Sequence, residues 1–396
     1  MNPVSIYPAI AALTIALSIS FLFVKRIGAP PISGRFVSID GLRGYLAFFV
    51  FLCHSSVWYF FLRTGRWEVP PSHLYTHFGQ SSVVFFFMIT GFLFWTKLID
   101  GRNKQINWSR LYVSRILRLA PLYFFMLLLL TILTAVLTNF VLNEPLNKLI
   151  MEIIKWSTFT ILGAPDLNGM NGTRLLIASV TWSLRYEWFF YLSLPISAVL
   201  IRVIPPYLYL FVSVASIVAL VLSHPDLHRL AAFGGGISAA FLVRWSSFTS
   251  FLNGSVGAVI ALLCIGATIS IFPSAYTPPA LFLLAIVFTI VACGNTLFGV
   301  LSSPISRSLG EIAYSIYLLH GIVLFVAFKF VIGFHNAASL SAIEHWLIVL
   351  CCSAVLIPVC FITFHWIEAP AMRAVPSVSG WIETRITLRA KGRAVL

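Results

Sequence analysis

The feature that most constrains this chain is a series of uninterrupted apolar runs, each about 20 residues long. Inside a bilayer every backbone N–H and C=O group must be paired within the protein, so only helices and closed barrels can span it. The runs lack the alternation of a barrel strand and have the length of a spanning helix. Composition agrees, because 59% of the residues are hydrophobic and 10% are charged, whereas soluble domains have about 25% charged residues.

The pattern predicts an all-α, polytopic transmembrane helical bundle with no soluble domain. A further amphipathic stretch, 146–159, lies in the long loop 143–180 and is typical of a helix at the membrane interface. The first run is followed by Lys25 and Arg26 and is expected to be an uncleaved spanning helix. The predicted spans are 6–24, 41–62, 81–98, 119–142, 182–202, 206–224, 229–245, 254–273, 279–301, 310–332 and 344–367.

Basic residues are distributed unevenly between the two predicted sides of the membrane. The chain has 26 Lys and Arg against 12 Asp and Glu, a net charge of +14. Cytoplasmic loops are enriched in Lys and Arg, and with eleven spans the segments 97–118 and 371–396 fall on one side. We therefore expect the plasma (inner) membrane, an outer N-terminus, a cytoplasmic C-terminus and no nucleic-acid partner. The opposite side has few basic residues: Arg63, Arg66, Lys148, Lys155, Arg174, Arg229 and Lys329.

Six cysteines all lie within apolar runs, and none forms a Cys-x-x-Cys pair. They are expected to be small buried hydrophobic residues rather than disulfide partners or metal ligands. No metal-binding motif is present, so no metal is predicted.

Ionisable side chains inside a membrane are costly and are therefore candidates for function. Asp40 and Arg43 begin the second run, and His54 follows Arg43 by eleven residues, roughly 16 Å along a helix. Arg43 is then near the cytoplasmic surface and His54 near mid-membrane, on the same helical face. A neutral imidazole there can act as a general base on a hydroxyl. The alternative is a structural histidine held by a helix–helix hydrogen bond.

A cluster of arginines precedes the fourth run. Arg110, Arg115 and Arg118 lie before Pro121, and the last two are three residues apart, on one helical face. The arginine fork suits phosphate groups, which predicts a clamp for a coenzyme entering from the cytosol. The alternative is a topology signal alone.

Two later segments also carry polar groups into the membrane. The fifth run begins at Trp182 and contains Glu187, which needs a partner elsewhere in the bundle. In the tenth run Tyr314 and Tyr317 are predicted to share a face with Glu311, and His320 lies deeper, where it can face the same cavity as His54. In the third run, Gly91 is expected to allow another helix to approach closely. The polar residues of the tenth run are Glu311, Tyr314, Tyr317 and His320.

Taken in order, these residues resemble the acyltransferase-3 family of membrane-bound O-acyltransferases, which includes bacterial O-antigen and Nod-factor acetylases. The similarity covers about residues 36–370 and departs from the family pattern at Arg185 and Tyr186. Each motif is weak alone, and the ordered set is specific. The set comprises Asp40-Gly41-Leu42-Arg43-Gly44 through His54, the Phe-rich segment at Gly91, Arg115-x-x-Arg118, Trp182-Ser183-Leu184 with Glu187, and Glu311-x-x-Tyr314-Ser315-x-x-Tyr317-Leu318-x-His320.

The resemblance implies a ten-helix acyltransferase core over 36–370, an extra N-terminal helix and linker over 1–35, and a basic cytoplasmic tail over 371–396. It implies transfer of an acyl group, with acetyl expected, from cytoplasmic acyl-CoA to a carbohydrate hydroxyl of a glycan or glycolipid, as in O-acetylation of lipopolysaccharide. The implied catalytic residues are His54, Arg43 and Asp40, with His54 either a base or a transient acyl carrier. Arg43, Arg110, Arg115 and Arg118 would bind the coenzyme. The implied cavity residues are Trp182, Glu187, Glu311, Tyr314, Tyr317 and His320, with Glu187 and His320 on the acceptor side.

Two other classes of protein are compatible with many apolar helices. A transporter or flippase of a lipid-linked saccharide would favour broken helices and inverted repeats, and no such repeat is evident in the sequence. A non-catalytic membrane scaffold would give no reason for histidines at mid-membrane.

Overall fold

The computed structural model describes residues 2–31, 36–103, 106–223 and 225–393, and the side chains of 386–393 are excluded from the description. The described part is helical and contains no strand, which confirms the predicted all-α polytopic bundle. Each of the eleven predicted apolar runs contains a helix. Arg389, Lys391 and Arg393 of the predicted basic tail have side chains outside the described ones, and Arg35 of the predicted linker lies outside the described residues altogether.

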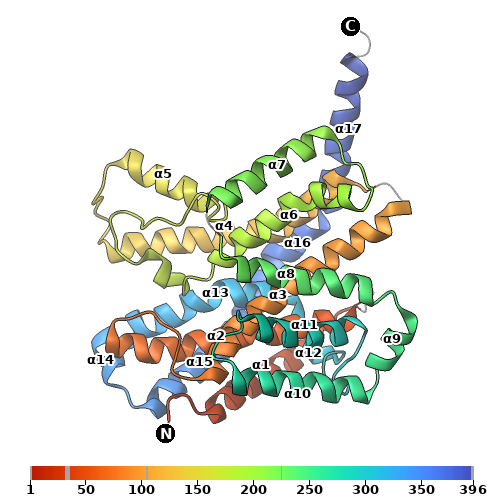
Figure 1. Cartoon of the computed structure of the whole chain (residues 1–396). Helices are drawn as coiled ribbons and strands as arrows, with labels where there is room; N and C mark the ends of the chain where they lie inside the picture. Colours follow the sequence, from red (N-terminus) through yellow and green to blue (C-terminus); the bar gives the residue numbers. More distant parts are fainter. Residues whose placement is uncertain (1, 32–35, 104–105, 224, 394–396) are drawn as a thin grey trace.

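Figure 1 shows how the helices are arranged, and their labels follow the order of the chain. The first half contains α1 (Ile6–Ile27), α2 (Val37–Thr64), α3 (His73–Asp100), α4 (Trp108–Leu137), α5 (Leu146–Ser157), α6 (Trp182–Leu200), α7 (Tyr207–Leu222) and α8 (Leu227–Leu242). The second half contains α9 (Ser246–Leu252), α10 (Ser255–Ile271), α11 (Pro278–Ala292), α12 (Pro304–Glu311), α13 (Ala313–Val326), α14 (Phe334–Ser339), α15 (Ala342–Thr363), α16 (Ala369–Arg373) and α17 (Val375–Arg393).

Six of the described helices are long and apolar enough to cross a membrane, or seven if the pair α9 and α10, bent by 71°, forms one span. This is fewer than the eleven predicted spans, and helix length is one cause. Helices α7 and α11 are apolar but have 16 and 15 residues, below the roughly 20 that a straight span needs. The protein is therefore a multi-pass membrane protein whose bundle combines long and short helices.

Two predicted boundaries were wrong in ways that affect the site. Helix α4 begins at Trp108, not near 119, and continues through Pro121, so the arginine cluster lies on its first turns rather than in a loop. The tenth run is divided at Ile312 into α12 and α13. Close backbone packing accompanies the break, because a Cβ atom on Gly310 would lie 1.9 Å from the backbone oxygen of Asp40.

Helices α3 and α8 are held together by glycine contacts. A Cβ atom on Gly91 would lie 2.5 Å from the backbone oxygen of Phe233, and one on Gly236 would lie 1.9 Å from that of Met88. The expected close approach at Gly91 is confirmed, and its partner is α8. Such backbone-to-backbone contacts favour a rigid pair of helices, and both helices contribute residues to the cavities described below.

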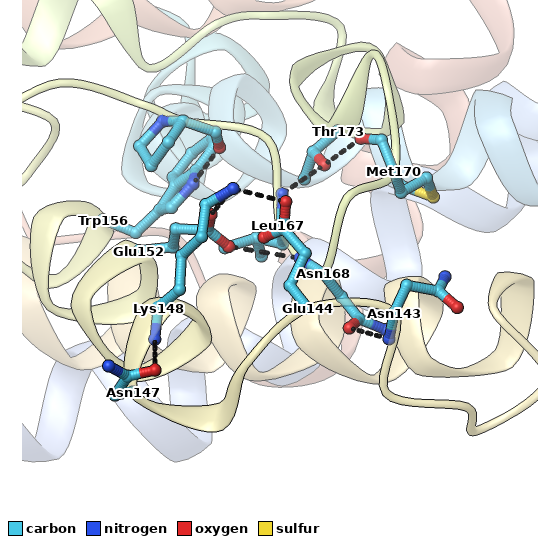
Figure 2. A network of polar contacts seen from close by, with 11 residues as sticks. Asn143, Glu144, Asn147, Lys148, Glu152, Trp156, Leu167, Asn168, Met170 and Thr173 are labelled. Carbon is cyan, nitrogen blue, oxygen red and sulfur yellow. Dashed lines mark hydrogen bonds and ion pairs between the residues drawn. The ribbon is translucent and has the colours of Figure 1, made fainter.

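In the view of Figure 1, α5 and α14 lie at one end of the bundle, on the left with the N-terminus, and α9 lies at the other. The segment 138–180 at the left end is held by a polar network around Asn168, seen from close by in Figure 2. Asn168 accepts from the Asn143 N–H and donates to Thr138 Oγ1 and to the Val141 oxygen, at 2.8–3.0 Å. The network fixes α5, which buries Glu152 and Trp156 and exposes Leu146, Ile150, Met151 and Ile154.

Candidate active site

Three cavities follow one another through the bundle, and neighbouring cavities share lining residues. The entrance cavity, of about 680 Å³, shares Arg115 and Arg118 with the central cavity, of about 90 Å³. The central cavity shares Val83 and Tyr317 with the outer cavity, of about 380 Å³. The three cavities therefore form a series that runs from the arginine-rich start of α4 to the end of the bundle where α2 and α3 are joined.

The entrance cavity is lined mainly by α4 and by the chain near Met372. Lys97, Arg110, Arg115 and Arg118 contribute four cationic groups, and Asp100 contributes one carboxylate. Arg118 Nη1 lies 3.2 Å from Met372 Sδ. A wide cavity with an excess of guanidinium groups is suited to a ligand with several phosphates.

The central cavity brings together residues that are far apart in the sequence. Arg43 from α2 lines it with Arg115 and Arg118 from α4, and none of the three forms an ion pair among the described residues. Glu187 from α6 also lines this cavity, and its Oε2 accepts a hydrogen bond of 3.0 Å from the Tyr191 hydroxyl. The sequence could not specify this grouping, because it depends on how three helices cross.

The outer cavity contains His54. Trp67 from the α2–α3 loop stacks on the His54 ring, with centroids 6.0 Å apart and planes at 20°. Aromatic and polar side chains complete the lining, among them Glu68, Trp182, Arg229, Tyr276 and Tyr317. Its volume falls within the range of small-molecule sites, about 300–1,000 Å³.

His320 lies directly behind His54. The two rings are nearly parallel, with centroids 5.1 Å apart, and His54 Nδ1 lies 2.9 Å from His320 Nε2. His320 Nδ1 lies 2.9 Å from the Ile316 oxygen. A carbonyl oxygen only accepts, so His320 Nδ1 carries a proton.

The protonation of His54 then follows. His320 is fully buried with no carboxylate beside it among the described contacts, and a charge there would be costly. In the neutral ring Nε2 is an acceptor, so His54 Nδ1 donates to it. The Nε2 atom of His54 is left with its lone pair and with no hydrogen-bond partner among the residues that the structure describes. A fixed tautomer with an open nitrogen in a cavity can take a proton from a ligand or attack a carbonyl carbon.

Tyr317 forms part of the wall between the central and outer cavities. Its hydroxyl donates to the Val180 oxygen at 2.9 Å and lies 2.7 Å from Ser183 Oγ. These contacts fix the ring, and they account for Ser183 in the Trp-Ser-Leu motif. Tyr314, one turn earlier, lines the central cavity and donates to the Leu119 oxygen at 3.0 Å.

The predicted site residues are therefore not all together. Trp182 and Tyr317 line the outer cavity with His54, while Glu187 lines the central cavity beside the arginines. His320 supports His54 rather than lining these cavities. Asp40 and Glu311 line none of the three, and the break at Ile312 puts Glu311 and Tyr314 on different helices.

Among the lining residues of the outer cavity that sequence reasoning missed, four have aromatic or charged side chains. Trp67 and Glu68 come from a short loop, Arg229 from the first turn of α8, and Tyr276 from the residues before α11. The available signal was Arg229, one of the few basic residues on the side that the sequence predicts to be non-cytoplasmic.

The fold and these cavities define a multi-pass helical membrane protein with a polar passage and a buried histidine pair. Sequence comparison identifies the protein family. Residues 36–365 match the model of the acyltransferase-3 family, described as an acyltransferase domain, and the chain belongs to this family.

The chain is also similar to the acyltransferase MdmB of Streptomyces mycarofaciens, with 29% identity over 190 residues. That alignment covers 44% of this chain and 42% of MdmB, so the chain spans less than half of this relative. No solved structure matches. Helix α1 precedes the matched region.

Proposed function

We propose that this enzyme transfers an acetyl group from cytoplasmic acetyl-CoA to a carbohydrate hydroxyl at the other side of the membrane. Family membership supports acyl transfer in general. The observation that carries the finer proposal is the series of cavities that leads from arginines without an ion-pair partner among the described residues to the open nitrogen of His54. A transporter would need neither the histidine pair nor its fixed tautomer.

The donor enters through the entrance cavity. Its phosphates bind Arg110, Arg115 and Arg118, and Arg43 attracts negative charge further in. The narrow central cavity admits the thin arm that carries the thioester, and the bulky nucleotide stays outside. The thioester carbonyl then reaches the wall formed by Val83 and Tyr317, next to His54.

The acceptor enters the outer cavity. His54 Nε2 takes the proton of an acceptor hydroxyl as that oxygen attacks the thioester carbonyl carbon. The C–S bond breaks, the ester forms, and the thiolate leaves as coenzyme A after it receives the proton. The same nitrogen could instead attack the thioester first and form an acyl-histidine, and the test below separates the two routes.

The test uses the full-length protein in inverted and in right-side-out membrane vesicles with radiolabelled acetyl-CoA. We expect label in the glycolipid fraction of inverted vesicles, where the cytoplasmic face is exposed, and little in right-side-out vesicles. His54→Ala should lower the rate by about 10²–10⁴-fold, the usual contribution of a positioned base. His335→Ala, at an exposed histidine of α14, is the matched control and should leave the rate unchanged.

Continued labelling at the normal rate in His54→Ala would make the catalytic assignment wrong. Equal labelling in both vesicle orientations would contradict a cytoplasmic donor. Label that stays on the purified wild-type protein without acceptor, and is absent from His54→Ala, would favour the acyl-histidine route over direct transfer.

A further inference from the structure

We infer that the outer cavity recognises an acceptor that carries a negative group, and that Arg229 binds this group. The inference rests on the proposed function, because it takes the outer cavity as the acceptor site. It adds the chemical class of the acceptor, an acidic or phosphorylated carbohydrate, and assigns a binding residue that the motifs do not contain.

The first observation is the position of Arg229. Among the described residues it is the only arginine or lysine that lines the outer cavity with His54. It belongs to the side of the bundle that we expect to be non-cytoplasmic, where few basic residues occur. The other basic residues of that side have local roles or are exposed: Arg63 stacks on Tyr59 and Lys148 pairs with Glu144. An arginine in this cavity is therefore not explained by membrane topology.

The second observation is the state of its guanidinium group. Its central carbon lies 4.3 Å from the centroid of the Trp182 ring and 5.6 Å from that of Tyr276, both cavity residues. Arg229 Nε forms an ion pair of 3.1 Å with Asp226 Oδ2, outside hydrogen-bond geometry, so Asp226 engages the Nε side of the guanidinium. The two terminal nitrogens have no hydrogen-bond partner among the described residues. The aromatic faces thus hold the fork in place and leave its donors available for a bidentate contact with a carboxylate or phosphate.

The third observation is how firmly this position is held. Arg229 lies two residues inside α8, whose N-cap Asp226 accepts from the His228 N–H at 3.0 Å. The Asp226 N–H in turn donates to the Tyr186 hydroxyl of α6 at 3.3 Å. Further along, the glycine contacts lock α8 against α3. The fork is therefore pre-positioned, and binding loses little conformational entropy.

The remaining lining suits the sugar part of such an acceptor. Trp67, stacked on His54, and Trp182, under Arg229, add aromatic surface to the cavity, and the exposed carboxylate of Glu68 can accept from hydroxyl groups. Glu68 and Arg229 form no ion pair among the described residues, so each remains available to the ligand. An anionic group at Arg229 would orient one hydroxyl of the sugar toward His54 Nε2.

The test measures binding of three small sugars to the full-length protein in nanodiscs of fixed lipid composition. The probes are methyl β-D-glucuronide, methyl β-D-glucoside 6-phosphate and the neutral methyl β-D-glucoside, titrated by saturation-transfer NMR. We expect wild type to bind at least one anionic sugar about tenfold more tightly than the neutral one. The carboxylate and phosphate arms show which group is preferred.

Arg229→Gln should remove the preference while the affinity for the neutral sugar changes less than twofold. Arg229→Lys keeps the charge without the fork and should retain part of it. Arg174→Gln, at an exposed outer arginine, is the matched control and should change nothing. A thermal unfolding curve for each variant shows whether the stack on Trp182 is needed for folding, and the wild-type comparison tests the inference without any substitution.

Equal affinity of wild type for all three sugars, or an equal loss for charged and neutral sugars in Arg229→Gln, would overturn the inference. Acetyl transfer from labelled acetyl-CoA is measured on the same samples. Transfer without any preference for an anionic sugar would reject the inference and keep the proposed function. Preferential binding of an anionic sugar without transfer to any probe would support the binding site at Arg229 and count against the proposed acetyl transfer.

Discussion

Two polar clusters of this membrane protein differ in how their hydrogen-bonding groups are used. In the outer-loop cluster, which comprises Glu144, Lys148, Glu152 and Asn168, most polar groups have a hydrogen-bond or ion-pair partner nearby in the protein (Figure 2). The side chain of Asn168 makes three hydrogen bonds, and the backbone N–H of Asn168 donates to Glu152 Oε2 at 3.2 Å. The residues of the passage cluster, Arg43, Arg115, Arg118, His54 and Arg229, line cavities instead, and among the described residues only Arg229 of this cluster forms an ion pair, with Asp226.

The difference separates stability from function. A polar group that is buried with its partners adds a modest net stability, and one left without partners costs free energy. The passage cluster carries that cost, since its three arginines at the centre have no carboxylate partner in ion-pair distance among the described residues. Such a cost is sustained where a ligand supplies the missing partner. Substitutions in the outer-loop cluster should therefore change stability, and substitutions in the passage cluster should change activity.

Among the predictions that compare the two clusters, the largest effect is expected for substitution of His320. This residue contacts His54 but lines none of the three cavities. His320→Phe keeps a flat ring but removes the acceptor that fixes the His54 tautomer. We expect kcat to fall about 100-fold, as for a misplaced catalytic group, with the KM for acetyl-CoA unchanged. His320→Gln offers an amide oxygen near the position of Nε2 and should recover much of the rate.

A purely structural role for His320 would give a different result. Both variants would then lose activity in proportion to their stability, with no rescue by glutamine. Stability is measured in detergent with a thiol-reactive dye, because the protein has free cysteines and most of them are buried. They become reactive when the bundle unfolds.

The second prediction concerns Asn168 in the outer-loop cluster. Asn168→Ala removes three side-chain hydrogen bonds at the junction of α4 with the loop, and should lower stability by about 2–3 kcal/mol. The rate per folded molecule and both KM values should stay at the wild-type level. Asn171→Ala, at an exposed position of the same loop, is the control. A changed acceptor KM in Asn168→Ala, with stability intact, would show that the two clusters are not separate.

How much of this the sequence could predict depends on the range of the interaction. Helix positions followed from hydropathy alone, because each apolar run needs only its own residues to form backbone hydrogen bonds. The breaks were missed where tertiary contacts decide them, as at Ile312, where α12 lies against the backbone of α2. Pro121 was taken as a boundary, yet α4 continues through it.

The candidate site shows the same limit. Arg43 and His54 could be placed on one face from spacing within one helix. The His54–His320 contact joins residues 266 positions apart, and only a shared cavity was expected of them. The tautomer of His54 follows only from the interatomic distances around His320. A binding role for Arg229 could not be assigned from the sequence, because a single arginine forms no motif. Its contacts with Trp182 and Tyr276, which come from other segments, exist only in the folded protein.

The smallest predicted effect tests the electrostatics of the outer-loop cluster. Burial raises the pKa of Glu152 above its ordinary value, so the folded state keeps this proton to a higher pH than the unfolded chain does. Its contribution to stability is then fully present below the ordinary pKa, about 4.3, and is lost as pH rises through the raised value. Glu152→Gln keeps an acceptor for the Asn168 N–H and removes this loss. We expect equal thermal stability with wild type at pH 4 and a gain of up to about 2 °C at pH 8.

Glu144 provides the matched control with the opposite sign. The contact with Lys148 lowers the pKa of Glu144, so its contribution is present above the ordinary pKa and is lost as pH falls through the lowered value. Glu144→Gln should therefore be less stable than wild type at pH 8 and equal to it near pH 3. If Glu152→Gln also lost stability at pH 8, Glu152 would be an ionised member of the cluster. Both carboxylates would then be compensated by the same lysine, and the outer-loop cluster would depend on charge and not on hydrogen bonds alone.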